Sequence, residues 1–160
     1  MHETKFRPTP YPKTQLKQIV WRLKEVDDIP KGFTRESVIH SPEDMYRQFH
    51  FLFDGLVNER FVVFILNSKN AVQAIEIVSE GTLNASLVHP RETFRAAILG
   101  IGAAIIVAHN HPSGNREPSS EDLSITRQLH EAGKIVGIPL HDHIIFTSDG
   151  YTSFAERGLL

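Results

Sequence analysis

Residues 103–122 read AAIIVAHNHPSGNREPSSED and carry the most informative pattern in the chain. The apolar run Ala103–Ala108 predicts a buried strand, and His109 and His111 come directly at its end. Residues two apart in an extended segment point to the same side, so we expect both imidazoles on one side and Asn110 on the other. Pro112 keeps the backbone of His111 extended and ends the strand.

Ser119 follows after a seven-residue loop and is typical of a helix N-cap, with acidic residues in the next turn. Position 122 shares a helix face with Ile125, Leu129 and Ala132, so Asp122 is expected on the core side. A carboxylate there is costly without a partner, and a metal held by His109 and His111 is one such partner. The structural alternative is that Ser119 and Asp122 only cap the helix, with both histidines on the surface.

The remaining patterns predict helices and strands that interleave along the chain. We expect helices over Thr14–Glu25, Ser41–Asp54, Pro90–Leu99 and Ser119–Gly133. We expect strands over Phe61–Leu66, Ala71–Ser79, Ala103–Ala108 and Ile138–Thr147, a break at Gly81, an extended path over Ser86–Val88 and a turn at Asp149–Gly150. This order indicates an α/β domain over residues 41–160 with a mixed sheet and an antiparallel hairpin over 61–79. Residues 1–40 are expected to form an N-terminal arm with one short helix, and the closing SFAERGLL is expected to pack on the domain.

Composition narrows the function classes. The chain has 160 residues and a net charge of −2, which gives no reason to expect a general polyanion binder. It has no cysteine, which excludes disulfides, thiolate metal sites and the cysteine-liganded zinc deaminases. No run of apolar residues approaches a membrane span and no signal peptide is evident, so we expect a cytoplasmic protein.

The His-x-His, seven-residue and Ser-x-x-Asp spacing resembles the JAMM motif of the MPN metallopeptidase family. More narrowly, residues 40–160 resemble the RadC family. The likeness is carried by GTLNASLVHPRETFRAAI (81–98), AAIIVAHNHPSG (103–114), PSSEDLSITRQL (118–129), DHIIF (142–146) and the closing SFAERGLL.

The resemblance implies a cytidine deaminase-like α/β fold, with a mixed central sheet flanked by helices. It also implies one Zn²⁺ per chain, held by His109, His111 and Asp122, and hydrolysis of peptide or isopeptide bonds. Glu59 matches the position of the family's catalytic glutamate, and we expect it to act as general base, with Ser119 donating to the oxyanion. The alternative for Glu59 is a solvated residue in a helix–strand turn, with Asp54, Glu76 and Glu80 as the rival acids.

The expected substrate is a protein or peptide. RadC proteins carry a traditional DNA-repair label, so DNA-repair or replication proteins are expected partners. The chain resembles the short form without the helix-hairpin-helix region, so direct DNA binding is not expected. Two alternatives stay open: a non-enzymatic metal-stabilised module that binds such proteins, and a nucleic-acid hydrolase. Asp142 and His143 are expected to make core hydrogen bonds or to support the metal ligands, and His141 is expected to be exposed.

Overall fold

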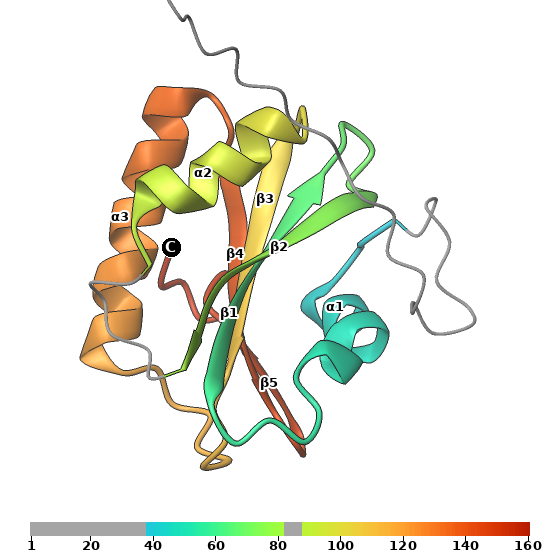
Figure 1. Cartoon of the computed structure of the whole chain (residues 1–160), viewed down its shortest axis with the longest axis vertical. Coiled ribbons are helices and arrows are strands. Elements are labelled where there is room, and N and C mark those ends of the chain that lie inside the picture. Colours follow the sequence, from blue (N-terminus) through green and yellow to red (C-terminus); the bar gives the residue numbers. More distant parts are fainter. Residues whose placement is uncertain (1–37, 82–87) are drawn as a thin grey trace, which may run out of the picture.

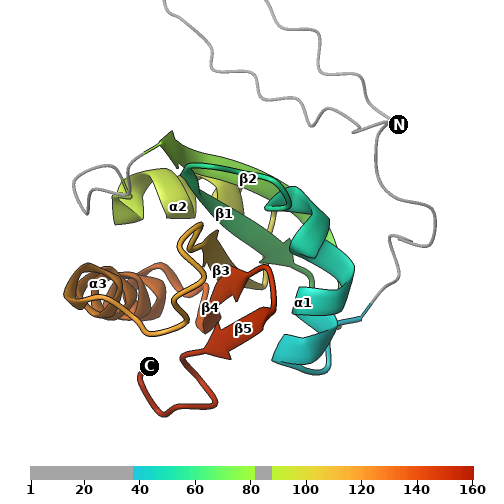
Figure 2. The same ribbon diagram turned by 90° about the horizontal axis from the view of Figure 1, so that it is seen from below.

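A mixed five-stranded sheet with helices on both faces forms the core of the domain (Figure 1). The computed structural model describes residues 38–81 and 88–160. The strand order is β2-β1-β3-β4-β5. Figure 2 shows α1 on one face of the sheet and α2 and α3 on the other. The elements are α1 (Pro42–Phe49), a 3-10 turn (His50–Leu52), β1 (Glu59–Leu66), β2 (Val72–Gly81), α2 (Pro90–Leu99), β3 (Ala104–Asn110), α3 (Ser120–Val136), β4 (Leu140–Thr147) and β5 (Gly150–Ser153).

The pairing of the strands confirms the mixed sheet. β1 pairs antiparallel with β2 and with β3, whereas β3 and β4 are parallel and are joined by the α3 crossover. β3 is buried along its whole length because it is the central strand. Alternate residues of the strands face two cores: Val62 and Phe64 pack on the α1 side, and Phe61 and Val63 pack on the side of α2 and α3.

The ends of two helices differ from those that the sequence predicts. The helix expected to reach Asp54 is regular only to Phe49 and tightens into a 3-10 turn, after which Gly55 adopts a positive φ of 71°. α3 continues past Gly133 to Val136 and ends at Gly137, where φ is 76°. Gly133 is therefore a packing position, since a Cβ there would lie 2.7 Å from the carbonyl oxygen of Ile138.

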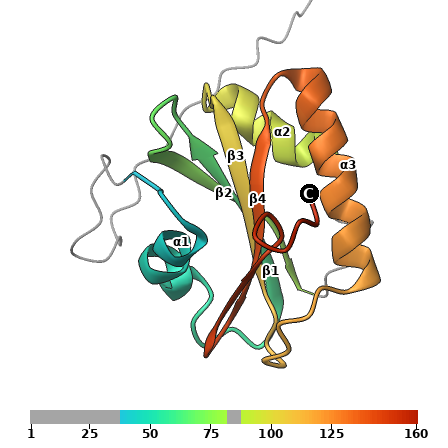
Figure 3. The ribbon, with the colours of Figure 1, turned by 180° about the vertical axis from the view of Figure 1, so that it is seen from behind.

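The chain beyond the predicted turn at Asp149–Gly150 forms a short strand that the sequence pattern did not predict. β5 pairs antiparallel with β4, and the following Phe154 is fully buried, as expected for a closing segment that packs on the domain. β2 also runs on to Gly81, beyond the predicted end at Ser79. In Figure 3 the segment after β5 curls back past β4, and its end lies beside α3.

The predicted arm with its helix over Thr14–Glu25 lies outside the described residues, as does most of the extended path over Ser86–Val88. Val38 bridges Ala71, and Ile39 is buried in the core beside α1, so both pack with the domain. Among the described residues, no helix combines the length and the apolar character needed to cross a membrane.

Candidate metal centre

His109 and His111 come from the carboxyl end of β3, and Asp122 comes from the first turn of α3 on the same face of the sheet. His109 alternates in step with Val107, which packs toward α3, so its side chain also faces α3. Of the described residues, these three are the group of histidine and acidic side chains whose ligand atoms converge, all within 4.8 Å of one another. The predicted ligand set is therefore assembled in space.

The separations of these atoms fit a small divalent ion. The two Nε2 atoms of His109 and His111 are 3.0 Å apart. Asp122 Oδ1 lies 3.2 Å from His109 Nε2, and Asp122 Oδ2 lies 3.5 Å from His111 Nε2. Metal–ligand bonds of about 2.0–2.2 Å in a tetrahedron place ligand atoms about 3.3–3.5 Å apart. The three side chains thus need little movement to hold zinc.

The outer nitrogens of both histidines are engaged away from the cluster. His111 Nδ1 lies 2.6 Å from the carbonyl oxygen of Asn115, which can only accept, so this nitrogen carries a proton. His109 Nδ1 lies 2.8 Å from His143 Nε2. A neutral His111 therefore presents the Nε2 lone pair to Asp122, and either a proton or a metal ion must lie between these acceptors.

The charges of the cluster agree with this arrangement. The hydrogen bond to Asp122 is the largest cause that raises the pKa of His111 above its ordinary value, and it outweighs burial. Burial acts to raise the pKa of Asp122, but the neighbouring imidazoles of His109 and His111 outweigh it and hold this pKa well below the ordinary range. The lowered pKa favours the anionic form of the Asp122 carboxylate, which is the form that binds a cation.

Asp122 serves the helix and the cluster together. Its Oδ2 accepts hydrogen bonds from the backbone N–H of Ser119 at 2.8 Å and from the Ser119 hydroxyl at 2.7 Å. The Ser119 Oγ accepts in turn from the Asp122 N–H at 3.1 Å, which completes a capping box. Capping and metal binding, which the sequence left as alternatives, are compatible because Oδ1 still faces His109.

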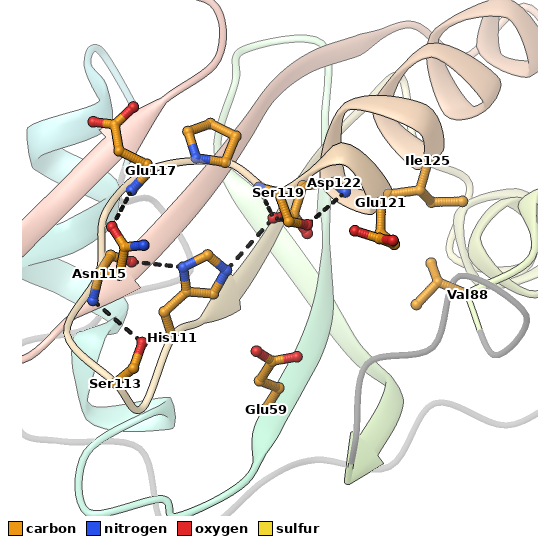
Figure 4. Close-up of a pocket in the computed structure, with 11 residues that line it drawn as sticks. Glu59, Val88, His111, Ser113, Asn115, Glu117, Ser119, Glu121, Asp122 and Ile125 are labelled. Carbon is orange, nitrogen blue, oxygen red and sulfur yellow. Dashed lines mark hydrogen bonds and ion pairs between the residues drawn. The ribbon is translucent and has the colours of Figure 1, made fainter.

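Glu59 is brought to the cluster by the register of the sheet. Phe61 lies opposite His109 in the antiparallel pair of β1 and β3. Glu59 comes two residues before Phe61 and His111 two residues after His109, so both lie at the same end of this strand pair, and both line one cavity. Glu59 is half-buried, and its carboxylate points into the space below His111 (Figure 4). It is thus the first residue of a strand and not only part of a turn.

A cavity of about 340 Å³ connects these groups. Its walls hold Glu59, Val88, His111, Ser113, Asn115, Glu117, Pro118, Ser119, Glu121, Asp122 and Ile125. The rival acids lie elsewhere: Asp54 lines a different cavity beside α1, Glu76 pairs with Arg95, and Glu80 pairs with Arg60. Glu59 is therefore the only one of the four candidate acids that lines the cavity with His111 and Asp122.

Polar residues behind the cluster extend the site into the core. His143 is fully buried beside His109, and Thr126 joins it from the next turn of α3 after Asp122. Asp142 accepts from the backbone of His143 and Ala155 and from the Ser153 hydroxyl, which is the predicted core role, and His141 is exposed as expected. The sequence analysis did not identify Thr126; a polar residue one turn after Asp122 on a core-facing helix was the available signal.

A family model described as RadC-like JAB domain matches residues 39–159. Among curated relatives, the UPF0758 protein STH371 of Symbiobacterium thermophilum is 58% identical over 64% of this chain and 44% of its own length. The UPF0758 protein GSU0386 of Geobacter sulfurreducens is 48% identical over 75% of this chain and 52% of its own length. The UPF0758 protein SH1266 of Staphylococcus haemolyticus is 45% identical over 80% of this chain and 56% of its own length. The chain thus spans about half the length of these relatives.

Proposed function

The chain belongs to the family of RadC-like JAB domains, and on this basis we propose that it is a zinc-dependent hydrolase that cleaves an amide bond in a protein or peptide. The observation that carries the proposal is the convergence of two imidazole nitrogens and a carboxylate oxygen within 4.8 Å, at a cavity that also holds Glu59. Two nitrogens and one oxygen are the ligand types of hydrolytic zinc sites that keep an open position.

Each residue has a defined task in the proposed reaction. His109, His111 and Asp122 would hold the ion. A bound zinc would supply Lewis acidity and lower the pKa of water from its bulk value to about 7. Glu59, which lines the same cavity, takes the proton from the attacking water and delivers it to the leaving amine. A carboxylate suits this task because it returns to the ionised state when the amine leaves.

We assign to the Ser119 hydroxyl the stabilisation of the oxyanion of the tetrahedral intermediate. In the structure this hydroxyl donates to Asp122 Oδ2, so it must turn toward the substrate when it acts. The backbone N–H of Ser119 continues to hold Oδ2 in either position. Loss of one oxyanion donor costs about 10²–10³ in turnover, which is the magnitude that we assign to Ser119.

The location and the partners are further parts of the proposal. We place the protein in the cytoplasm, with DNA-repair or replication proteins as the candidate partners. Direct binding to DNA is not part of the proposal, since the net charge of −2 offers little attraction for a polyanion.

The proposal is tested with purified protein in two steps. Elemental analysis first measures zinc bound per chain, and a peptide library with and without chelator then detects cleavage. Glu59→Gln is expected to retain zinc and to abolish turnover. Glu80→Gln is the matched control, because this residue pairs with Arg60 and does not line the cavity; it should keep both properties.

Four outcomes would overturn parts of the proposal. Full activity of Glu59→Gln would remove the assigned base, and loss of zinc from this variant would make Glu59 a ligand. Stoichiometric zinc with no cleavage of any peptide would favour the non-enzymatic module instead. If the wild type cleaved nucleic acid in a chelator-sensitive reaction and cleaved no peptide, the nuclease alternative would be favoured.

A further inference from the structure

We infer that His143 and Thr126 are positioning residues for the metal centre, and that they commit His109 to the tautomer whose Nε2 lone pair faces the cluster. The inference rests on the proposed zinc site, and it identifies residues that orient the ligands of that site. Neither residue touches the cavity; both act through His109 and Asp122.

The hydrogen bond between Thr126 and the Asp122 backbone fixes the donors and acceptors of the whole network. The Thr126 Oγ1 lies 2.6 Å from the backbone carbonyl oxygen of Asp122. A carbonyl can only accept, so the single hydroxyl proton of Thr126 is donated there. Thr126 Oγ1 also lies 2.6 Å from His143 Nδ1. Since the hydroxyl proton is already used, Thr126 accepts from this nitrogen, and His143 Nδ1 carries a proton.

The tautomer of His143 then determines the tautomer of His109. A neutral His143 that is protonated on Nδ1 presents a lone pair on Nε2, which lies 2.8 Å from His109 Nδ1. His109 must donate to this lone pair, so its own proton is on Nδ1. The remaining Nε2 lone pair of His109 points to His111 and Asp122. A fully buried His143 is held neutral here because a second proton would place a charge between aromatic rings.

The ring of His143 is held in position by the closing segment of the chain. Phe154 stacks on it with centroids 4.5 Å apart and an interplanar angle of 19°, and Phe61 meets it edge-on at 5.6 Å. The backbone is held as well, since the His143 carbonyl accepts from the Phe154 N–H at 2.9 Å. Asp142 accepts from the backbone N–H groups of His143 and Ala155. This gives the buried C-terminal Phe154 a role in the site.

The network links two ligands that come from different elements. It starts at His109 on β3, crosses His143 on β4, and ends at the main chain of Asp122 on α3. The spacing between β3 and α3 at the cluster is therefore set by hydrogen bonds as well as by apolar packing. Breaking the network should weaken zinc binding although all three ligands remain.

The test measures zinc dissociation constants by competition with a chromophoric chelator. Thr126→Val keeps the shape of the side chain but removes the acceptor, so His143 is free to adopt the other tautomer and to compete for the lone pair of His109. Loss of a residue that orients a ligand raises the dissociation constant about 10–100-fold, and this is the expected result. Thr126→Ser retains the hydroxyl and should restore affinity to within about twofold of wild type.

Thr93→Val is the matched control. Thr93 is fully buried on α2, and its Oγ1 has no hydrogen-bond partner within the part of the chain that the structure describes. The same chemical change there should leave zinc affinity at the wild-type value. His143→Phe is a second variant, which keeps a ring between Phe61 and Phe154 and should weaken zinc binding to a similar extent as Thr126→Val.

Nitrogen-15 NMR of the histidine side chains gives a readout that does not need metal. In wild-type protein without metal, His109 should show a protonated Nδ1, and in Thr126→Val or His143→Phe this preference should decrease. The inference is overturned if Thr126→Val folds with unchanged zinc affinity, or if His109 Nδ1 is unprotonated in the wild type. Failure of the wild type to bind zinc would instead refute the proposed function, while the NMR result would still decide the tautomer.

Discussion

Replacement of Gly133 by alanine should destabilise the domain although alanine is the better helix former. Gly133 lies within α3, and on propensity alone the change would stabilise the helix by about 1 kcal/mol. The added Cβ would however lie 2.7 Å from the carbonyl oxygen of Ile138 and 3.3 Å from the ring of Phe94. The carbonyl belongs to the backbone between α3 and β4 and cannot rotate away as a side chain tip would.

The magnitude follows from these two opposed effects. Overpacking of a filled core costs about 1–3 kcal/mol, and the clash with backbone points to the upper half of that range. After subtraction of the helix gain, we expect a net loss of about 1–2 kcal/mol in the free energy of unfolding. Urea unfolding followed by circular dichroism measures this, with a lower midpoint and an unchanged slope.

Ser124→Ala is the control for helix propensity, because Ser124 is exposed in the middle of the same helix. This variant should be as stable as wild type or slightly more stable. An increase in stability for Gly133→Ala, equal to that of an unhindered site, would refute the reasoning, since it would mean that the α3–β4 connection yields without cost.

Three further predictions concern the cluster. Ser119→Ala should lower the unfolding free energy of the metal-free protein by about 0.5–2 kcal/mol through loss of the N-cap, measured by urea unfolding; an unchanged midpoint would contradict the capping role. The raised pKa of His111 stabilises the metal-free fold fully below the unfolded value of about 6.5, and this contribution is lost as pH rises through the folded pKa. Zinc must displace the proton from His111, so the zinc affinity measured by chelator competition should still increase with pH above about 6.5. A zinc affinity that stays constant with pH in this range would contradict the prediction. Free zinc at about 100 times its dissociation constant should stabilise the fold by about 2.7 kcal/mol, and a thermal melt unaffected by chelator would argue against a site in the folded state.

The sequence pattern was informative where the interactions are local. The apolar run that became β3, the N-cap at Ser119 and the paired facing of His109 and His111 all depend on neighbours a few residues away. Such features follow from backbone geometry and can be read without the fold. Errors occurred where packing overrode a local rule, as at Gly133, which the sequence suggested as a helix end.

The sequence by itself determined the identity and the spacing of the candidate metal ligands, because strand and helix periodicity place His109, His111 and Asp122 on facing surfaces. Only the tertiary structure decided which groups surround them. The antiparallel register of β1 and β3 brings Glu59 to the end of the sheet where His111 lies, and the parallel pairing of β3 and β4 places His143 behind His109. The physical reason is that strand order and register depend on the burial of whole sheet faces, which no single stretch of the chain encodes.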